Sequence, residues 1–226
     1  MVDYTTLGTD ECDQVITFRT FADDNTQDDP SFSDTFQPRP MDVTAYKQNT
    51  VGIQAALADT SLPTLYWNNH DMARVATRYG DPDYPQASAK ALATALYLQR
   101  GIPIIYYGEE LGLTNIRYHD IADFEDQTVP TFVASAQAAG KSKVEIMRML
   151  NQTHKMAGRG PMQWDNTVYH GFSDHLPWKH GDTDDMNAQA EIADPDSIYH
   201  YYQQLLQLKQ CAPFTNAVSY THLRAH

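Results

Sequence analysis

The chain has 226 residues, of which 42% are hydrophobic and 20% charged, so its composition is that of a folded domain and excludes general disorder. Its net charge of −13 disfavours nucleic acid and anionic membrane surfaces as partners, although acidity also serves solubility alone. No apolar run is long enough to span a bilayer, and no signal peptide is recognisable. Cys12 and Cys211 have neither disulfide-framework nor zinc-site spacing, which favours a cytoplasmic location and predicts no metal.

Short apolar runs alternate with helical patterns in the first half of the chain. Residues 23–40 are rich in Asp, Ser and Pro and predict a loop. Strands are expected at 14–18, 62–67 and 102–108, and helices at 43–58 and 87–100. The side chains expected to face inward from the second helix are Ala91, Leu92, Ala95, Leu96 and Leu98.

The regular alternation stops after residue 108. Residues 131–152 predict two short helices separated by Gly140, and Ser142 and Glu145 have capping-box spacing for the second one. Residues 153–193 read as irregular. A last helix is expected to begin at Asp194-Pro195. Its expected buried face consists of Ile198, Tyr201, Tyr202, Leu205 and Leu208.

The order of these elements predicts an α/β fold with a parallel sheet. Three strands with an open edge do not complete such a fold, and a (β/α)8 barrel, or TIM barrel, needs eight. We therefore expect a partial barrel that belongs to a larger structure.

One polar segment directly follows an expected strand. In residues 65–78, LYWNNHDMARVATR, the strand runs into Asn68, Asn69, His70 and Asp71. Polar residues at the C-terminal ends of barrel strands line the active-site face. The alternative is a turn in which Asn and Asp only cap the next helix. The residues alone leave both interpretations open.

Several motifs together resemble glycoside hydrolase family 13, the α-amylase superfamily. NNHD is similar to that family's fourth conserved region, and GIPIIYYGEELGLTN (101–115) resembles the last barrel strand and the following loop of its oligo-1,6-glucosidase and dextran glucosidase branch. RGPMQWD (159–165), GFSDHLPW (171–178) and ADPDSIYHYYQQLLQLKQ (193–210) resemble the oligo-1,6-glucosidase and dextran glucosidase branch. The resemblance covers roughly residues 10–215.

The resemblance implies roles for three residues. Asp71 matches the third catalytic carboxylate, which stabilises the oxocarbenium-like transition state, and His70 matches a histidine that binds sugar hydroxyls. Arg159 matches an arginine that helps to close the pocket around a terminal glucose, although the preceding KMAG departs from the branch pattern. Several other charged or histidine side chains are expected to have no catalytic or metal-binding role. Glu109 and Glu110 are expected to support their loop, Arg74 and Arg78 to lie on a helix face, and His119 and His154 to bind no metal.

The resemblance also implies what this chain lacks. Residues 14–18 match the sixth barrel strand, so the nucleophile and the acid/base that a retaining glycosidase needs are expected upstream of Met1. Residues 1–217 would form the C-terminal half of the catalytic barrel, about strands 6–8 with their helices, without the C-terminal β-sandwich. Residues 218–226, VSYTHLRAH, resemble a translated sequencing adapter and are expected to be a non-native tail. No cofactor is expected, and any structural calcium would bind in the missing half.

The expected function is hydrolysis of terminal α-glucosidic bonds, α-1,6 bonds above all, in short oligosaccharides with retention of configuration. The sugar would be the partner, and the oligomeric state stays open. Related alternatives are an α-1,4-glucosidase, a sucrose isomerase and a trehalose synthase. A non-catalytic amylase-like protein and an inert partial product are alternatives of other classes. We expect the 226 residues alone to be inactive, and either poorly soluble or partly molten.

Overall fold

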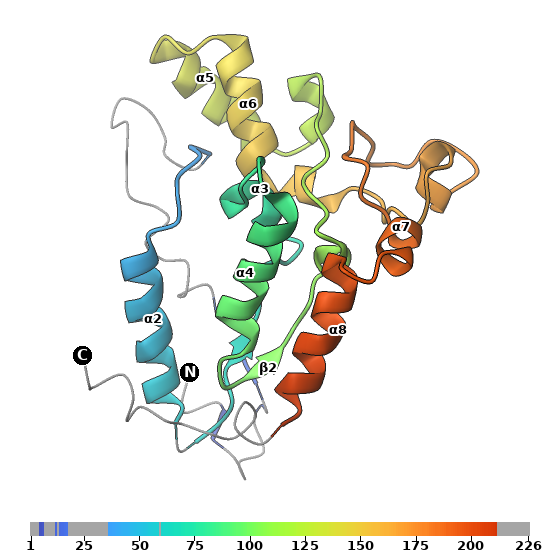
Figure 1. Ribbon diagram of the computed structural model, residues 1–226. Helices are drawn as coiled ribbons and strands as arrows, with labels where there is room; N and C mark the ends of the chain where they lie inside the picture. Colours follow the sequence, from blue (N-terminus) through green and yellow to red (C-terminus); the bar gives the residue numbers. More distant parts are fainter. Residues whose placement is uncertain (1–4, 7–11, 13, 18–35, 59, 212–226) are drawn as a thin grey trace.

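The computed structural model describes residues 5–6, 12, 14–17, 36–58 and 60–211 (Figure 1). These residues are mostly helical and contain one sheet of two short strands. The long helices α4 (Pro85–Tyr97) and α8 (Ile198–Lys209) pack against each other, and α2 (Val43–Ala56) lies on the other side of α4 (Figure 1). No helix in the described ranges is long and apolar enough to cross a membrane.

The two strands form a parallel pair with helices between them in the chain. Strand β1 (Thr64–Leu65) pairs with β2 (Ile102–Pro103), and α3 (Val75–Tyr79) and α4 connect them. The N–H of Ile104 donates to the Leu65 carbonyl over 2.8 Å. Because the strands are parallel, their carboxyl ends meet at one edge, and the segments that follow both strands come together there.

The expected strand at 14–18 is wrong for residues 14–17, which have no regular secondary structure; Phe18 lies outside the described residues. The segment still lies against β1. The Thr64 hydroxyl donates to the Val15 carbonyl over 2.9 Å, and the Tyr66 hydroxyl donates to the Thr17 carbonyl over 2.8 Å. These contacts come from side chains, whereas a strand requires a backbone ladder. The expected strands at 62–67 and 102–108 exist but pair over two residues each.

The main core lies between the sheet and the helices α4 and α8. Trp67, which follows β1, is 1% exposed and donates its indole N–H to the Leu92 carbonyl over 2.7 Å. The expected inward face of α4 is partly wrong, because Ala91 and Ala95 are exposed. Packing against both β1 and α8 selects a neighbouring stripe of the helix. Its buried residues are Ala89, Ala93, Leu96 and Tyr97.

A second core holds the two helices expected in 131–152. Helix α5 (Val129–Ala138) and helix α6 (Lys143–Thr153) pack around buried Phe132, Ile146 and Leu150. The predicted capping box is confirmed: the Ser142 hydroxyl accepts the Glu145 N–H, and the Glu145 carboxylate accepts the Ser142 N–H over 2.8 Å.

The region expected to be irregular contains 3-10 turns and one short helix. The turns are η4 (Lys155–Arg159) and η5 (Val168–Gly171), and the helix is α7 (Ala188–Ala193). The predicted start of the last helix is wrong by about one turn. Ser197 caps α8 by accepting the His200 N–H over 3.2 Å, whereas the Asp194 carboxylate accepts the Asp196 N–H in the turn before it.

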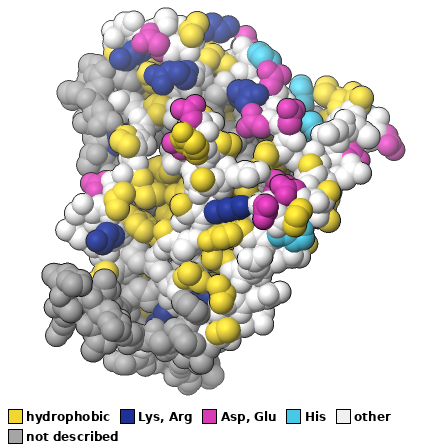
Figure 2. All heavy atoms as spheres, viewed as in Figure 1, with side chains coloured by type: hydrophobic (Ala, Val, Ile, Leu, Met, Phe, Trp, Pro, Cys, Tyr) yellow, Lys and Arg dark blue, Asp and Glu magenta, His cyan; other side chains and the backbone are white. Residues whose placement is uncertain are grey.

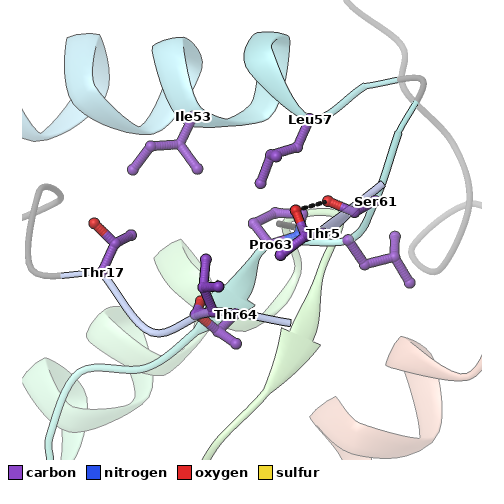
Figure 3. A pocket seen from close by; sticks show the side chains of 9 residues that line it. Thr5, Thr17, Ile53, Leu57, Ser61, Pro63 and Thr64 are labelled. Atoms are coloured by element: carbon purple, nitrogen blue, oxygen red, sulfur yellow. Dashed lines mark hydrogen bonds between the residues drawn. The ribbon is translucent and has the colours of Figure 1, made fainter. Parts of the chain in front are cut away.

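A small pocket marks the opposite end of β1 from the polar segment (Figure 3). Ile53 and Leu57 of α2 point into it, and the hydroxyls of Thr5 and Ser61 lie 3.0 Å apart on its other side. Its volume of about 10 Å³ is room for about one water molecule, so it is a packing defect and not a substrate site.

Candidate active site at the carboxyl end of the sheet

The polar segment Asn68–Asp71 leaves the core after β1 and the buried residues Tyr66 and Trp67. Asn68 is 2% exposed, but the side chains of His70 and Asp71 are 72% and 48% exposed. The Asn69 side-chain oxygen accepts the Asp71 N–H over 2.7 Å, which makes a tight turn. The segment therefore anchors one amide in the core and presents an acid and an imidazole at the surface.

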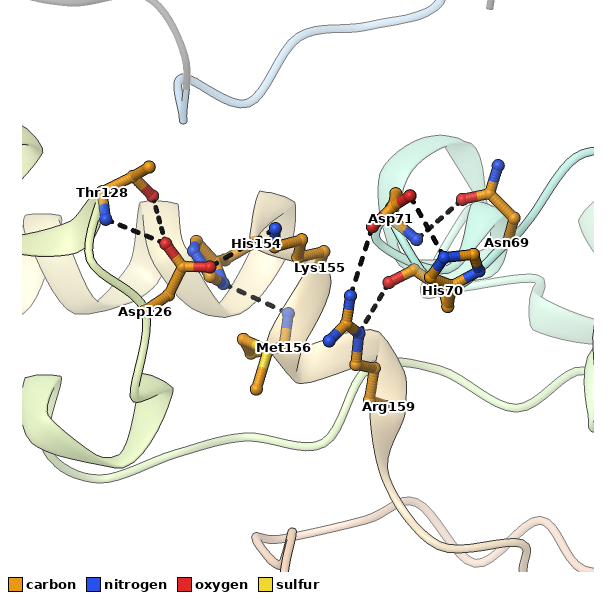
Figure 4. Close-up of polar contacts among 9 residues, drawn as sticks. All are labelled: Asn69, His70, Asp71, Asp126, Thr128, His154, Lys155, Met156 and Arg159. Carbon is orange, nitrogen blue, oxygen red and sulfur yellow. Dashed lines mark hydrogen bonds and ion pairs between the residues drawn. The ribbon is translucent and has the colours of Figure 1, made fainter. Parts of the chain in front are cut away.

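Arg159 reaches this segment from a part of the chain that is 88 residues away (Figure 4). Its Nε donates to the His70 carbonyl over 2.6 Å, and its Nη2 lies 3.2 Å from Asp71 Oδ1. The other carboxylate oxygen of Asp71 lies 3.2 Å from His70 Nε2. The structure thus brings together the three residues singled out from the sequence, with the carboxylate between a guanidinium and an imidazole.

The turn η4 places Arg159 by two local features. The ring nitrogen Nδ1 of His154 accepts the Met156 N–H over 3.2 Å and caps the turn. Gly158 passes close to the polar segment, because a Cβ there would lie 2.8 Å from the Met72 carbonyl oxygen. A larger residue at 158 would push the turn, and Arg159 with it, away from Asp71.

Arg74, which the sequence analysis expects on a helix face, is instead buried beside the polar segment. It is 2% exposed and precedes α3, so it is not a helix-face charge. Its guanidinium donates to the Tyr107 carbonyl over 2.7 Å and lies 4.7 Å from the centre of the Tyr107 ring, while burial lowers its pKa. The Tyr107 hydroxyl in turn donates to the Gly160 carbonyl over 2.6 Å. Arg74 and Tyr107 thereby join the segments after both strands to the turn that carries Arg159.

Glu109 lies beneath the polar segment at the start of the turn η2 (Glu109–Leu111) and is 4% exposed. It accepts hydrogen bonds from Asn68, Tyr97 and Tyr202, so its role is larger than the backbone support expected for it. Burial raises its pKa to about 7 against the lowering effect of these donors. Glu110 does not share these contacts.

A second polar cluster lies beside η4 (Figure 4). Burial lowers the pKa of His154 to about 4, and hydrogen bonds from Thr128 lower the pKa of Asp126 to about 2. Lys155 Nζ lies 3.4 Å from Asp126 Oδ2. The imidazole is therefore held neutral as a cap for the turn. Across the described part of the chain, no group of three or more His, Cys, Asp or Glu is placed to hold a metal ion.

The face of the molecule seen in Figure 2 carries both hydrophobic and charged side chains. Figure 2 shows hydrophobic side chains gathered near the middle of this face, with charged side chains mainly around them. A cavity of about 620 Å³ lies apart from the polar segment, and its lining includes Arg78, Arg117, Arg148 and Asp184. None of Asn69, His70, Asp71 and Arg159 lines it.

Comparison with known proteins decides the family. The model of the alpha-amylase catalytic domain matches residues 1–217. The chain belongs to the alpha-amylase family. This is glycoside hydrolase family 13, so the resemblance seen in the sequence is confirmed.

Curated relatives in the alpha-amylase family include several α-glucosidases. The chain is 35% identical to an oligo-1,6-glucosidase of Halalkalibacterium halodurans over 175 residues, which are 76% of this chain and 31% of the relative. It is 36% identical to an alpha-glucosidase of Pediococcus pentosaceus over 223 residues, which are 95% of this chain and 39% of the relative. The chain thus spans about a third of the length of these relatives.

Solved structures give the same result. A family GH13_31 enzyme superposes with a TM-score of 0.80 at 46% identity, over 94% of this chain and 38% of that one. Trehalose-6-phosphate hydrolase of Bacillus licheniformis superposes with a TM-score of 0.84 at 31% identity, over 95% of this chain and 39% of that one. The described fold is therefore part of an alpha-amylase family catalytic domain.

Proposed function

We propose that this chain is the C-terminal part of the catalytic barrel of a retaining α-glucosidase that cleaves terminal α-glucosidic bonds, α-1,6 bonds above all, in short oligosaccharides. The observation that carries the proposal is the convergence of Arg159, His70 and Asp71 at the carboxyl end of the parallel strands. Several relatives named oligo-1,6-glucosidase support the linkage. The cytoplasmic location expected from the cysteines stays a prediction.

In this proposal Asp71 is a catalytic carboxylate. Glycoside cleavage builds positive charge on the sugar ring, and a fixed carboxylate stabilises that charge more than it stabilises the neutral substrate. Asp71 suits this role because its side chain is about half exposed and is held in place by Arg159 and by the turn at Asn69. A nucleophile and an acid/base must be supplied by carboxyl groups from the remaining part of the barrel.

His70 and Arg159 are proposed to bind the sugar. The His70 ring is exposed beside Asp71, where its nitrogens can reach the hydroxyls of the same glucose unit. Arg159 is less exposed and bonds to both neighbours, so it holds the segment in the conformation that receives the sugar. A related trehalulose synthase variant, 29% identical with a TM-score of 0.76, was solved in complex with isomaltulose, which supports a sugar ligand.

The test uses the longest polypeptide that the source gene encodes through these residues. We expect Asp71→Asn to lower kcat for isomaltose by on the order of 10³-fold with little change in the melting temperature. Asp83→Asn is the matched control, because Asp83 is exposed and lies outside the site. Equal kcat values for the two variants would contradict the proposal.

The roles of the neighbours predict a different kinetic signature. We expect Arg159→Lys to raise KM by about tenfold, because a lysine keeps the charge but cannot bond to both the His70 carbonyl and Asp71. Arg148→Lys is the control, since Arg148 lies on α6 away from these contacts. An unchanged KM for Arg159→Lys would remove Arg159 from the site.

A further inference from the structure

The buried carboxylate of Glu109 has three side-chain donors from three separate parts of the fold. Its Oε2 accepts from Asn68 Nδ2 over 2.5 Å, and its Oε1 accepts from the hydroxyls of Tyr97 on α4 over 2.5 Å and Tyr202 on α8 over 3.0 Å. Both tyrosines are themselves buried. The carboxylate therefore joins the two long helices of the core to the first residue of the polar segment.

The backbone before Glu109 is built to turn it inward. Gly108 has a φ of 78°, a conformation that side chains disfavour, and a Cβ there would lie 2.4 Å from the Leu113 side chain. This turn follows β2 after residues 104–107, and the carboxyl end of β2 lies beside that of β1. Glu109 is thus aimed at the end of β1 by the loop of the neighbouring strand.

Asn68 connects Glu109 to the loop between β1 and α3. Its Nδ2 donates to Glu109, and its Oδ1 accepts the N–H of Val75, the first residue of α3, over 2.5 Å. The carboxylate accepts and the N–H donates, so the orientation of the amide is fixed. Asn68 consequently closes the loop of residues 69–74, which contains His70 and Asp71, at both of its ends.

We propose that Glu109 is a positioning residue for Asp71, acting through Asn68, which it holds in the one orientation that closes the loop between β1 and α3. The inference rests on the proposed function of Asp71 and adds a residue that does not touch the substrate. Its chemistry is a buried acceptor facing a buried amide donor.

The charged groups around Glu109 agree with this assignment. Apart from the two hydroxyls and the amide, Glu110 on the same turn and Arg74 from the neighbouring loop act on it through their charges. Asn68 Nδ2 can only donate, so any proton on Glu109 must sit on Oε1, facing the tyrosine hydroxyls. Both protonation states therefore keep the bond to Asn68.

The contact between residues 68 and 109 should also form when the amide and the carboxylate exchange places. Asn68→Asp alone places two buried carboxyl groups face to face, and we expect kcat for isomaltose to fall about 100-fold with a smaller change in KM. Glu109→Gln alone keeps every contact, with its oxygen toward Asn68 and its amide toward the hydroxyls, so we expect a change of less than about fivefold. In the double variant the new amide donates to the new carboxylate, and kcat should recover at least about tenfold over Asn68→Asp.

The control is Asn187→Asp, because Asn187 is also 2% exposed, bonds through both ends of its amide and has no contact with Glu109. Addition of Glu109→Gln should not rescue Asn187→Asp. The inference is overturned if the double variant is no more active than Asn68→Asp, or if the rescue also occurs in the control.

Melting temperatures of the same proteins separate this inference from the proposed function. If the wild-type protein hydrolyses no α-glucoside, the proposed function fails. The contact between Asn68 and Glu109 is then tested by whether Glu109→Gln restores the melting temperature lost in Asn68→Asp. If the wild-type protein is active and the double variant recovers its melting temperature but not kcat, the contact between Asn68 and Glu109 only stabilises the fold, and the positioning role is overturned.

Discussion

Two buried groups near the polar segment titrate over overlapping pH ranges with opposite effects on stability. The pKa of Glu109 is raised from 4.5 to about 7, so the folded state binds the proton more tightly and stability falls as pH rises from 4.5 to 7. The pKa of His154 is lowered from 6.5 to about 4, so the unfolded state binds the proton more tightly and stability falls as pH drops from 6.5 to 4. In the wild-type chain the two slopes partly cancel.

Single variants should reveal each slope. We expect Glu109→Gln to make the free energy of unfolding rise more steeply with pH between 4.5 and 6.5 than in the wild-type chain, because the opposing contribution of Glu109 is removed while that of His154 stays. His154→Asn, whose side-chain oxygen can still accept the Met156 N–H, should make it fall over the same range. The measurement is urea unfolding at several pH values, with exposed His175→Asn as the control. Identical pH slopes in the two variants would contradict the assignment.

At this scale the sequence indicated which polar residues lie together but not what holds them in place. Asp71, His70 and Arg159 carry motif information, and the structure places them in contact. Arg74 is expected on a helix face, yet it is buried against Tyr107, and a buried arginine is uncommon. Such a contact depends on the close approach of two loops, which no local pattern reveals.

At the scale of elements, a cap decides where the last helix begins. Both Asp194 and Ser197 are cap-forming residues, but the Asp194 side chain is used in the turn at Asp196, and Ser197 bonds to the first turn of α8. Two adjacent cap signals cannot be ranked from the sequence alone. The helix itself is confirmed, and so is the burial of Ile198, Tyr202 and Leu205, because periodicity extends over many residues while a boundary rests on one bond. The expected burial of Leu208 is wrong: it is 48% exposed at the C-terminal end of the helix.

This boundary is testable. We expect Ser197→Ala to lower the free energy of unfolding by about 1 kcal/mol, because an N–H in the first turn of α8 loses its partner. Asp196→Ala is the matched control, since its exposed side chain does not cap the helix. Thermal or urea unfolding of the two variants measures the difference. A larger loss in Asp196→Ala than in Ser197→Ala would contradict the observed start.

The strands show a different reason for error. An apolar run such as 102–108 marks burial, but a strand also needs a partner backbone, and β1 and β2 pair over only two residues. Residues 14–17 lie against β1 through hydroxyl bonds and form no ladder. The sequence therefore predicted the position of each segment better than its secondary structure.

At the scale of the whole molecule, apolar side chains of the sheet face solvent. Ile102 and Ile104 are 41% and 37% exposed, and Ile16, in the segment that lies against β1, is 58% exposed. In relatives about three times as long, further chain is available to cover such positions. Exposed apolar strands promote association, which supports the prediction that the 226 residues alone are poorly soluble.

Self-association should depend on these side chains. We expect the 226-residue chain to elute as a concentration-dependent oligomer in size-exclusion chromatography, and Ile104→Lys to shift it toward the monomer. Ile192→Lys is the control, because Ile192 is 55% exposed on α7, away from the strands. A sharp cooperative melt and a monomeric wild-type chain at all concentrations would contradict the prediction.

The most direct test of the central claim is proton NMR of isomaltose hydrolysis by the longest polypeptide that the source gene encodes through these residues. Retention and inversion of configuration differ in which anomer of glucose is released first. If the protein is a retaining α-glucosidase, the anomeric proton signal of α-glucose appears first, and this signal is absent for Asp71→Asn. Release of β-glucose first, or no hydrolysis of any α-glucoside, would contradict the assignment of this chain to such an enzyme.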